Sequence, residues 1–161
     1  MCIRDRLGVI TEITVKLTKK PEVAKLVMAG FDSVRDCANA VADIIKNGII
    51  PAGLEMMDEF AIEASEEFAR PGYPLGSKAL LLCELDGSDE LVSDDLETVL
   101  SLLSRASSVR VSESEEERLL LWKGRKSAFP AVGRISPDYY CMDGTIPKLS
   151  LIHISEPTRP Y

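Results

Sequence analysis

The residues best suited to chemistry in this sequence are Gly124 and Arg125, near the end of a predicted helix. Helical spacing places Arg125 on the same stripe as Leu121 and Ala128, at the edge of the face that the helix buries. The neighbouring glycine has no side chain, so another group can approach the helix closely there. A guanidinium at such an edge is a good fork for a carboxylate, which makes Arg125 a candidate ligand-binding residue. The simpler alternative is an ordinary salt bridge to one of the many glutamates.

A short strand predicted over 139–142 follows this helix and leads to an Asp143-Gly144 turn. Tyr139 and Tyr140 are adjacent, so they point to opposite faces of the strand. One of them is expected in the core and the other can line a cleft. The residues alone do not decide which.

The two ends of the chain can both be read from one short DNA word. Met1-Cys-Ile-Arg-Asp-Arg6 can be encoded by ATG TGT ATA AGA GAC AG plus one base, and the reverse complement of that word can encode Leu149 to Ile154. Residues 1–6 and 149–161 are therefore interpreted as translated sequencing adapter and set aside from the fold. The natural segment is then 7–148, cut from a longer protein. The single histidine, His153, falls outside it, so no histidine chemistry is available to the segment.

Composition limits the class of protein. The chain of 161 residues is 45% hydrophobic and 28% charged, which fits one globular domain. Its formal net charge of −7 argues against non-specific binding of nucleic acid. Cys37, Cys83 and Cys141 show no Cys-x-x-Cys spacing, which makes zinc and disulfide frameworks poor interpretations and favours buried thiols in a reducing compartment. The apolar runs are too short to cross a membrane.

An acidic group surrounds Gly87: Glu84, Asp86, Asp89 and Glu90. These residues lack the alternating oxygen ligands and the terminal glutamate of a calcium-binding loop. They are interpreted as a solvated turn, and no metal site is predicted within the segment.

The elements that must position these residues alternate between strand and helix. Strands are predicted over 7–17, 23–31, 51–57, 78–86 and near 109–111, and helices over 34–45, 58–68, 92–106 and 113–129, the last stopped by Pro130. The most hydrophobic strand, 78–86, should be central in its sheet. Two β-α-β units predict an α+β, ferredoxin-like fold, with a mainly antiparallel sheet and helices packed on it. The break at 18–21 is the predicted domain boundary.

Five patches of sequence, in order, resemble a known family: 7–14, 53–58, 80–87, 122–134 and 136–147. They are similar to the FAD-linked oxidase C-terminal region of the vanillyl-alcohol-oxidase-type flavoproteins, and within it to the flavin-carrying subunits of glycolate oxidases. This resemblance implies that 7–20 is the end of an FAD-binding domain, including its strand, and that 21–148 is part of the substrate domain.

The resemblance also implies roles for particular residues. Gly8, Val9 and Ile10 would place backbone against FAD, and Arg125 would hold the substrate carboxylate. Tyr140 and Asp143 would lie on the strand that leads to the substrate pocket. The family's histidine-flanked Gly-Asp-Gly-Asn motif should follow Lys148, so the segment would contain no catalytic base. A divalent metal would be held only by residues that the segment lacks.

The implied activity of the parent is oxidation of a small 2-hydroxy acid, preferably glycolate, with hydride passing from its alpha carbon to FAD. Other oxidase subunits, including an iron–sulfur subunit, would be partners in the cytoplasm or peripherally at the inner face of the cell membrane. The same enzyme type acting on D-lactate or D-2-hydroxyglutarate is an alternative. A non-catalytic ferredoxin-like module for ligand binding or subunit interaction is another, because fold alone does not fix function. The chain by itself is expected to be inactive.

Overall fold

The computed structural model describes residues 11–136 and 138–140. Within them four strands and five helices follow one another as β1 (Val23–Phe31), α1 (Val34–Lys46), β2 (Gly53–Asp58), α2 (Glu59–Ala69), β3 (Ala79–Gly87), α3 (Asp89–Leu102), β4 (Ser108–Val111), α4 (Glu115–Lys126) and α5 (Ala128–Ile135). The strands form one sheet in the order β2-β3-β1-β4, and every neighbouring pair is antiparallel. This is the predicted ferredoxin-like arrangement, with α2 inserted between β2 and β3 and with α4 and α5 added after β4. The predicted fold class is confirmed.

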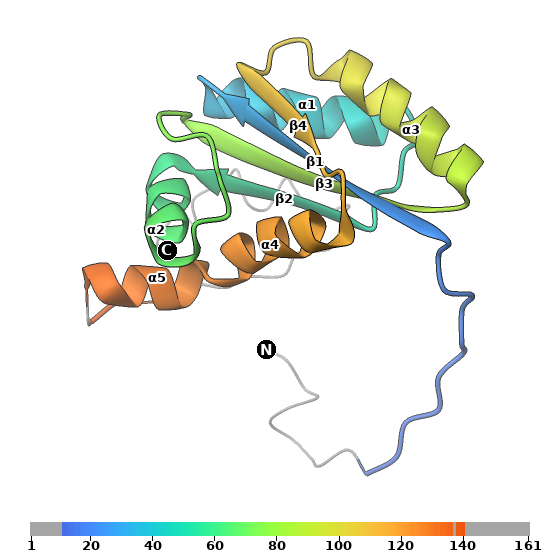
Figure 1. The fold of residues 1–161 in the computed structure, drawn as a ribbon, viewed down its shortest axis with the longest axis horizontal. Helices are drawn as coiled ribbons and strands as arrows, with labels where there is room; N and C mark the ends of the chain where they lie inside the picture. The colour runs from blue at the N-terminus through green and yellow to red at the C-terminus, as the bar shows by residue number, and fades with distance from the viewer. Residues whose placement is uncertain (1–10, 137, 141–161) are drawn as a thin grey trace, which may run out of the picture.

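The sheet separates two layers of helices (Figure 1). Helices α1 and α3 cover one face, and α2, α4 and α5 cover the other. Each face has its own core: Phe31, Ile44 and Leu81 lie in the first, and Ile62, Leu80 and Leu121 in the second. Strand β3 is buried on both faces because it is central, as its continuous apolar sequence predicts.

Side-chain caps fix the starts of four helices. The capping residues are Ser33, Asp58, Ser88 and Ser114, each of which accepts a hydrogen bond from a backbone N–H in the first turn. Asp58 is both the last residue of β2 and the cap of α2, so the chain turns from strand to helix without a loop. This direct connection places the end of β2 and the start of α2 together at one edge of the sheet.

The helix predicted over 113–129 is in fact two helices. Helix α4 ends at Lys126, and α5 begins at Ala128 and contains Pro130. The predicted stop at Pro130 is wrong because the proline is the third residue of α5, where a helix has no acceptor for a backbone N–H within itself. The break falls instead at Ser127, whose backbone N–H and hydroxyl both bond back to Lys123 O.

Two predicted strands are absent from the part of the chain that the structure describes. Residues 11–17 have no regular structure, and Ile13, Val15 and Leu17 are 73%, 67% and 88% exposed. Figure 1 shows this segment running away from the sheet, so no described strand pairs with it. Tyr139 and Tyr140 are also outside any strand, and residues 141–142 of that prediction lie beyond the described range.

The predicted apolar stripes are only partly buried. For the helix over 34–45, helical spacing predicts one apolar stripe made of Val34, Cys37, Ala38, Val41, Ile44 and Ile45. Helix α1 buries Cys37, Ala40 and Ile44, but Val34 and Ile45 are exposed. For the helix over 58–68, the apolar residues Phe60, Ile62, Ala64 and Phe68 are the ones expected to be buried. Helix α2 does bury Ile62 and Ala64, but Phe60 is 77% exposed. Helical spacing therefore found where α1 and α2 lie and was less accurate about which of their apolar residues are buried.

The two described cysteines should make stability depend on alkaline pH. Burial raises the pKa of Cys37 to about 11, and burial, with a smaller effect of Asp95, raises that of Cys83 to about 12, both from 9.0. The stabilisation is complete below pH 9.0 and is lost as pH rises through the folded-state values, because the unfolded chain releases these protons first. We expect the free energy of unfolding to fall between pH 9 and 10 with a slope of up to about 1.4 kcal/mol per unit per thiol. Urea titrations should show this slope, and a Cys37→Ala, Cys83→Ala chain should lack it; equal slopes would refute the assignment.

Candidate functional site

Arg125 lines a surface hollow of about 540 Å³ at the edge of the sheet. The hollow lies between the end of β2, the start of α2 and the junction of α4 with α5. Its polar and aromatic lining includes Asp58, Arg125, Phe129, Tyr139 and Tyr140. A guanidinium therefore stands beside exposed rings, an arrangement that can hold a small carboxylate with an apolar or flat neighbour.

The backbone of α4 reaches this position by packing closely on the loop after α2. Gly124 is buried, and a Cβ at that position would lie 2.6 Å from both Pro71 Cγ and Tyr73 Oη. Tyr73 Oη donates a 2.6 Å hydrogen bond to Leu121 O, one turn earlier in the helix. Its buried site raises the pKa of the Tyr73 phenol. The predicted close approach at Gly124 is confirmed, and its occupant is the protein's own Tyr73 loop.

The close packing at Gly124 leads to a stability prediction. Gly124→Ala should lower the free energy of unfolding by about 1–2 kcal/mol, because overpacking costs about 1–3 kcal/mol and alanine returns up to about 1 kcal/mol of helix propensity. Gly133→Ala is the matched control within α5, where the new Cβ meets only Tyr139 Cε1, at 3.5 Å. That control should be neutral or stabilising in a urea titration. A Gly124→Ala chain as stable as the Gly133→Ala chain would contradict the packing argument.

Arg125 is paired within the chain with Glu55 of β2. Its Nε and Nη2 donate to the same oxygen, Glu55 Oε2, at 3.2 and 3.0 Å. The two side chains are 31% and 42% exposed. A pair so open to solvent contributes about 0–1 kcal/mol. The alternative prediction of a salt bridge to a glutamate is thus confirmed, yet the pair is weak enough for a second carboxylate to engage the same guanidinium.

A more buried network holds α4 against the sheet. Glu84 of β3 accepts a 2.7 Å hydrogen bond from Arg118 Nη1 and another from Trp122 Nε1. Glu84 and Arg118 are each 16% exposed, and Arg118 also binds Glu115. These carboxylates raise the pKa of Arg118. The interpretation of Glu84 as part of a solvated turn is wrong, because its side chain points under α4.

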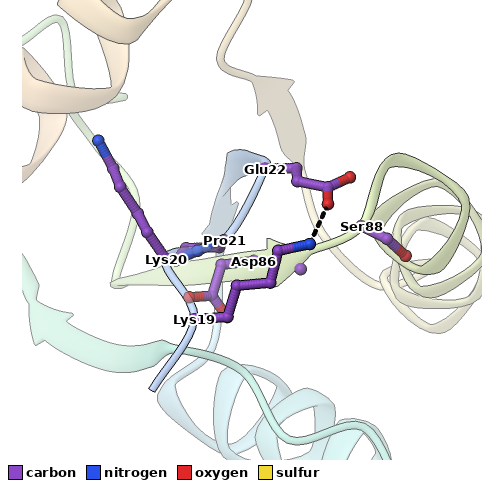
Figure 2. A pocket seen from close by; sticks show the side chains of 7 residues that line it. Lys19, Lys20, Pro21, Glu22, Asp86 and Ser88 are labelled. Carbon is purple, nitrogen blue, oxygen red and sulfur yellow. Dashed lines mark hydrogen bonds and ion pairs between the residues drawn. The ribbon is translucent and has the colours of Figure 1, made fainter. Parts of the chain in front are cut away.

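The rest of that acidic group does lie on the surface. Asp86 borders a second hollow of about 380 Å³, which Lys19, Lys20 and Ser88 also line. Lys19 Nζ lies 2.7 Å from Glu22 Oε1. Figure 2 shows Lys19 turned toward Glu22, while Lys20 extends away from that pair. The cations and carboxylates are mixed, so this hollow favours neither an anion nor a metal ion.

The predicted site residues divide into those the structure describes and those it does not. Arg125 and Tyr140 line the same hollow. Tyr139 lines it as well and is exposed, so the expectation that one tyrosine enters the core is wrong. Asp143 and residues 8–10 lie outside the described residues, and their roles stay predictions.

Sequence reasoning missed Glu55. The signal was present, because Glu55 alternates with Gly53 and Met57 and must share their face of β2. Met57 is in the core of that face, and Gly53 contacts Trp122 of α4. A charged residue between them has to find a partner on α4, and Arg125 is that partner.

Metal binding and membrane spanning find no support in the described residues. No three His, Cys, Asp or Glu side chains among them gather where they could hold a metal ion. No helix among them is both long enough and apolar enough to cross a bilayer.

Comparison with known proteins relates this chain to flavoenzymes. The family described as FAD linked oxidases, C-terminal domain, matches residues 20–159. Glycolate oxidase subunit GlcD of Escherichia coli is 57% identical over 152 residues, which is 93% of this chain and 30% of that protein. The Bacillus subtilis subunit of the same name is 37% identical over 92% of the chain and 32% of its own length.

The names of more distant relatives include a substrate other than glycolate. The mitochondrial D-lactate dehydrogenase [cytochrome] of Arabidopsis thaliana is 30% identical over 93% of this chain and 26% of its own length. Among solved structures, an alkyldihydroxyacetonephosphate synthase superposes with a TM-score of 0.53 at 13% identity, covering 73% of this chain and 24% of that one. That likeness concerns the fold alone. This chain spans less than a third of the length of each of these curated relatives.

Proposed function

The chain belongs to the family of FAD-linked oxidase C-terminal domains, and we propose that its parent is an FAD-dependent 2-hydroxy-acid oxidoreductase of the glycolate oxidase type. The identity to glycolate oxidase subunits, high over almost the whole chain, supports glycolate above the alternatives D-lactate and D-2-hydroxyglutarate. The chain would supply part of the substrate side of the active site. The observation that carries the proposal is Arg125 lining an aromatic hollow in a chain of this family.

Arg125 is the residue that would bind the substrate carboxylate. Arginine presents five N–H donors, and the pairing with Glu55 engages only Nε and Nη2. The remaining donors can form a charge-assisted fork with a second carboxylate. Such a fork would fix the orientation of a small 2-hydroxy acid and so hold its alpha carbon in one place for reaction.

The described residues fit the substrate side of a flavin site. Phe129, Tyr139 and Tyr140 present exposed rings beside Arg125, which suits a flat aromatic ring system. FAD, when bound, would accept the hydride that leaves the substrate alpha carbon. The residues proposed to contact FAD, 8–10, and the proposed substrate residue Asp143 lie outside the described range. A divalent metal would need ligands from elsewhere in the parent.

The organisation of the parent is part of the proposal. Residues 7–20 would end the FAD-binding domain and 21–148 would form part of the substrate domain. The parent would work with other subunits, including an iron–sulfur subunit, in the cytoplasm or at the inner membrane face. Residues 1–6 and 149–161 would be adapter sequence, although the family match extends to residue 159. Sequencing the parent gene across Lys148 tests this, since a natural continuation identical to 149–161 would overturn it.

The function itself is tested on the intact parent. We expect the purified protein to show a stoichiometric flavin spectrum that is bleached by glycolate without oxygen. The non-catalytic module is the competing proposal, and it predicts a parent gene with neither an upstream flavin domain nor a downstream histidine motif. A flavin-containing parent that no 2-hydroxy acid reduces would overturn the proposed activity and keep the family.

A further inference from the structure

The hollow beside Arg125 has an uneven balance of charge. Among the described residues that line it, Arg125 is the one cationic side chain, and Asp58 lines it as well. Glu55 Oε2 accepts two hydrogen bonds from the guanidinium of Arg125. The one positive charge is therefore already paired with one carboxylate, Glu55, and a second carboxylate, Asp58, lines the same hollow before any substrate arrives.

From this balance we infer that Glu55 is a specificity-determining residue that makes the site favour 2-hydroxy acids with one carboxylate over those with two. The inference rests on the proposed function, because it concerns the substrate of the same site. A monocarboxylate brings the one negative charge that the free donors of Arg125 can receive. A dicarboxylate brings a second negative charge, which is repelled by Asp58 in the lining and by Glu55 on Arg125. The described lining residues offer no further cation to receive it.

Geometry separates the two acidic residues. Asp58 Oδ1 accepts from Ala61 N at 2.9 Å and caps α2, so its carboxylate is engaged in the fold. Glu55 is 42% exposed, and its partner is the proposed substrate-binding group itself. Removing the charge of Glu55 therefore changes the hollow with the least effect on the helix start, and Glu55→Gln keeps an oxygen that can accept from Arg125.

The size of the effect follows from Coulomb's law. Two unit charges about 6 Å apart in an effective dielectric constant of about 40 change binding about tenfold. Because both carboxylates would be partly solvated, salt should weaken the discrimination, as the Debye length shrinks to about 3 Å at 1 M. A purely steric preference would not respond to salt.

The experiment uses the intact flavoprotein and two substrates, D-lactate and D-malate, which differ by one carboxylate. Wild type should have the higher kcat/KM with D-lactate, and Glu55→Gln should raise the malate-to-lactate ratio of kcat/KM about tenfold. Asp43→Asn is the matched control, because Asp43 is an exposed carboxylate on α1, across the sheet from the hollow. The ratio in that variant should equal that of wild type.

A second readout does not depend on turnover. Calorimetry can use 2-hydroxy-2-methylpropanoate and 2-hydroxy-2-methylbutanedioate, which bind without reacting because they have no alpha hydrogen to lose. The Glu55→Gln substitution should shift the ratio of their Kd values toward the dicarboxylate, by a factor similar to the change in the kcat/KM ratio. An active parent whose two ratios are unchanged in that variant would overturn the inference alone. A wild type that prefers the dicarboxylate would do the same. A parent that oxidises no 2-hydroxy acid would overturn the proposed function and this inference with it.

Discussion

Replacing Arg125 with methionine in the intact parent should lower kcat/KM for glycolate by about 30- to 150-fold. A hydrogen-bonded contact between charged groups contributes about 2–3 kcal/mol, and each 1.4 kcal/mol is a factor of ten. The methionine fills similar space and removes every donor, so the loss measures the carboxylate fork. Steady-state kinetics with glycolate, together with the flavin spectrum as a check on folding, make the measurement.

The lysine variant separates charge from geometry. Arg125→Lys keeps the positive charge and loses the planar fork, so its kcat/KM should fall between wild type and Arg125→Met. Lys126→Met is the control, because Lys126 is the next residue of α4, is exposed and does not line the hollow. The Lys126→Met substitution should change kcat/KM less than twofold, because an exposed side chain away from the site contributes little. An Arg125→Met enzyme with the kinetics of the Lys126→Met enzyme would remove Arg125 from the active site.

The sheet was predictable from sequence because its two central strands, β1 and β3, are buried on both faces. The continuous apolar run of β3 identifies it as a central strand without any knowledge of which strands pair with it. The order of strands and helices then permits few topologies. The start of α1 is set by an equally local feature, because Ser33 stands directly before the predicted helix and caps it. Burial on one face of a helix is harder, because Phe60 and Ile62 are both apolar and only packing decides which of them faces the sheet.

The candidate site was predictable in part. Arg125 and Gly124 were found because helical spacing and a missing side chain are local signals. The roles of Glu55 and Glu84 were not found, because each depends on a partner on α4 that is distant in the chain. Glu55 pairs with Arg125, 70 residues away, and Glu84 pairs with Arg118, 34 residues away. A lone glutamate in an apolar strand indicates that a partner exists and does not say where it is.

Glu84 gives the largest stability prediction. Glu84→Ala should lower the free energy of unfolding by about 2–4 kcal/mol, because breaking a buried ion pair costs about 3–5 kcal/mol and this one is not wholly buried. The change leaves Trp122 Nε1 without its acceptor, and Arg118 keeps only Glu115. Glu84→Gln retains an oxygen for one donor and should cost less. Urea titrations of the chain give the three values.

The control for Glu84 lies two residues further along the same strand. Asp86→Ala removes an exposed carboxylate and should change the free energy of unfolding by less than about 0.5 kcal/mol. Because Glu84 holds Arg118 and Trp122, its loss should also loosen the helix that carries Arg125. In the intact parent, Glu84→Ala should therefore raise KM for glycolate while Asp86→Ala does not. A Glu84→Ala chain as stable as Asp86→Ala would mean that the packing of Leu121, and not this ion pair, fixes α4 on the sheet.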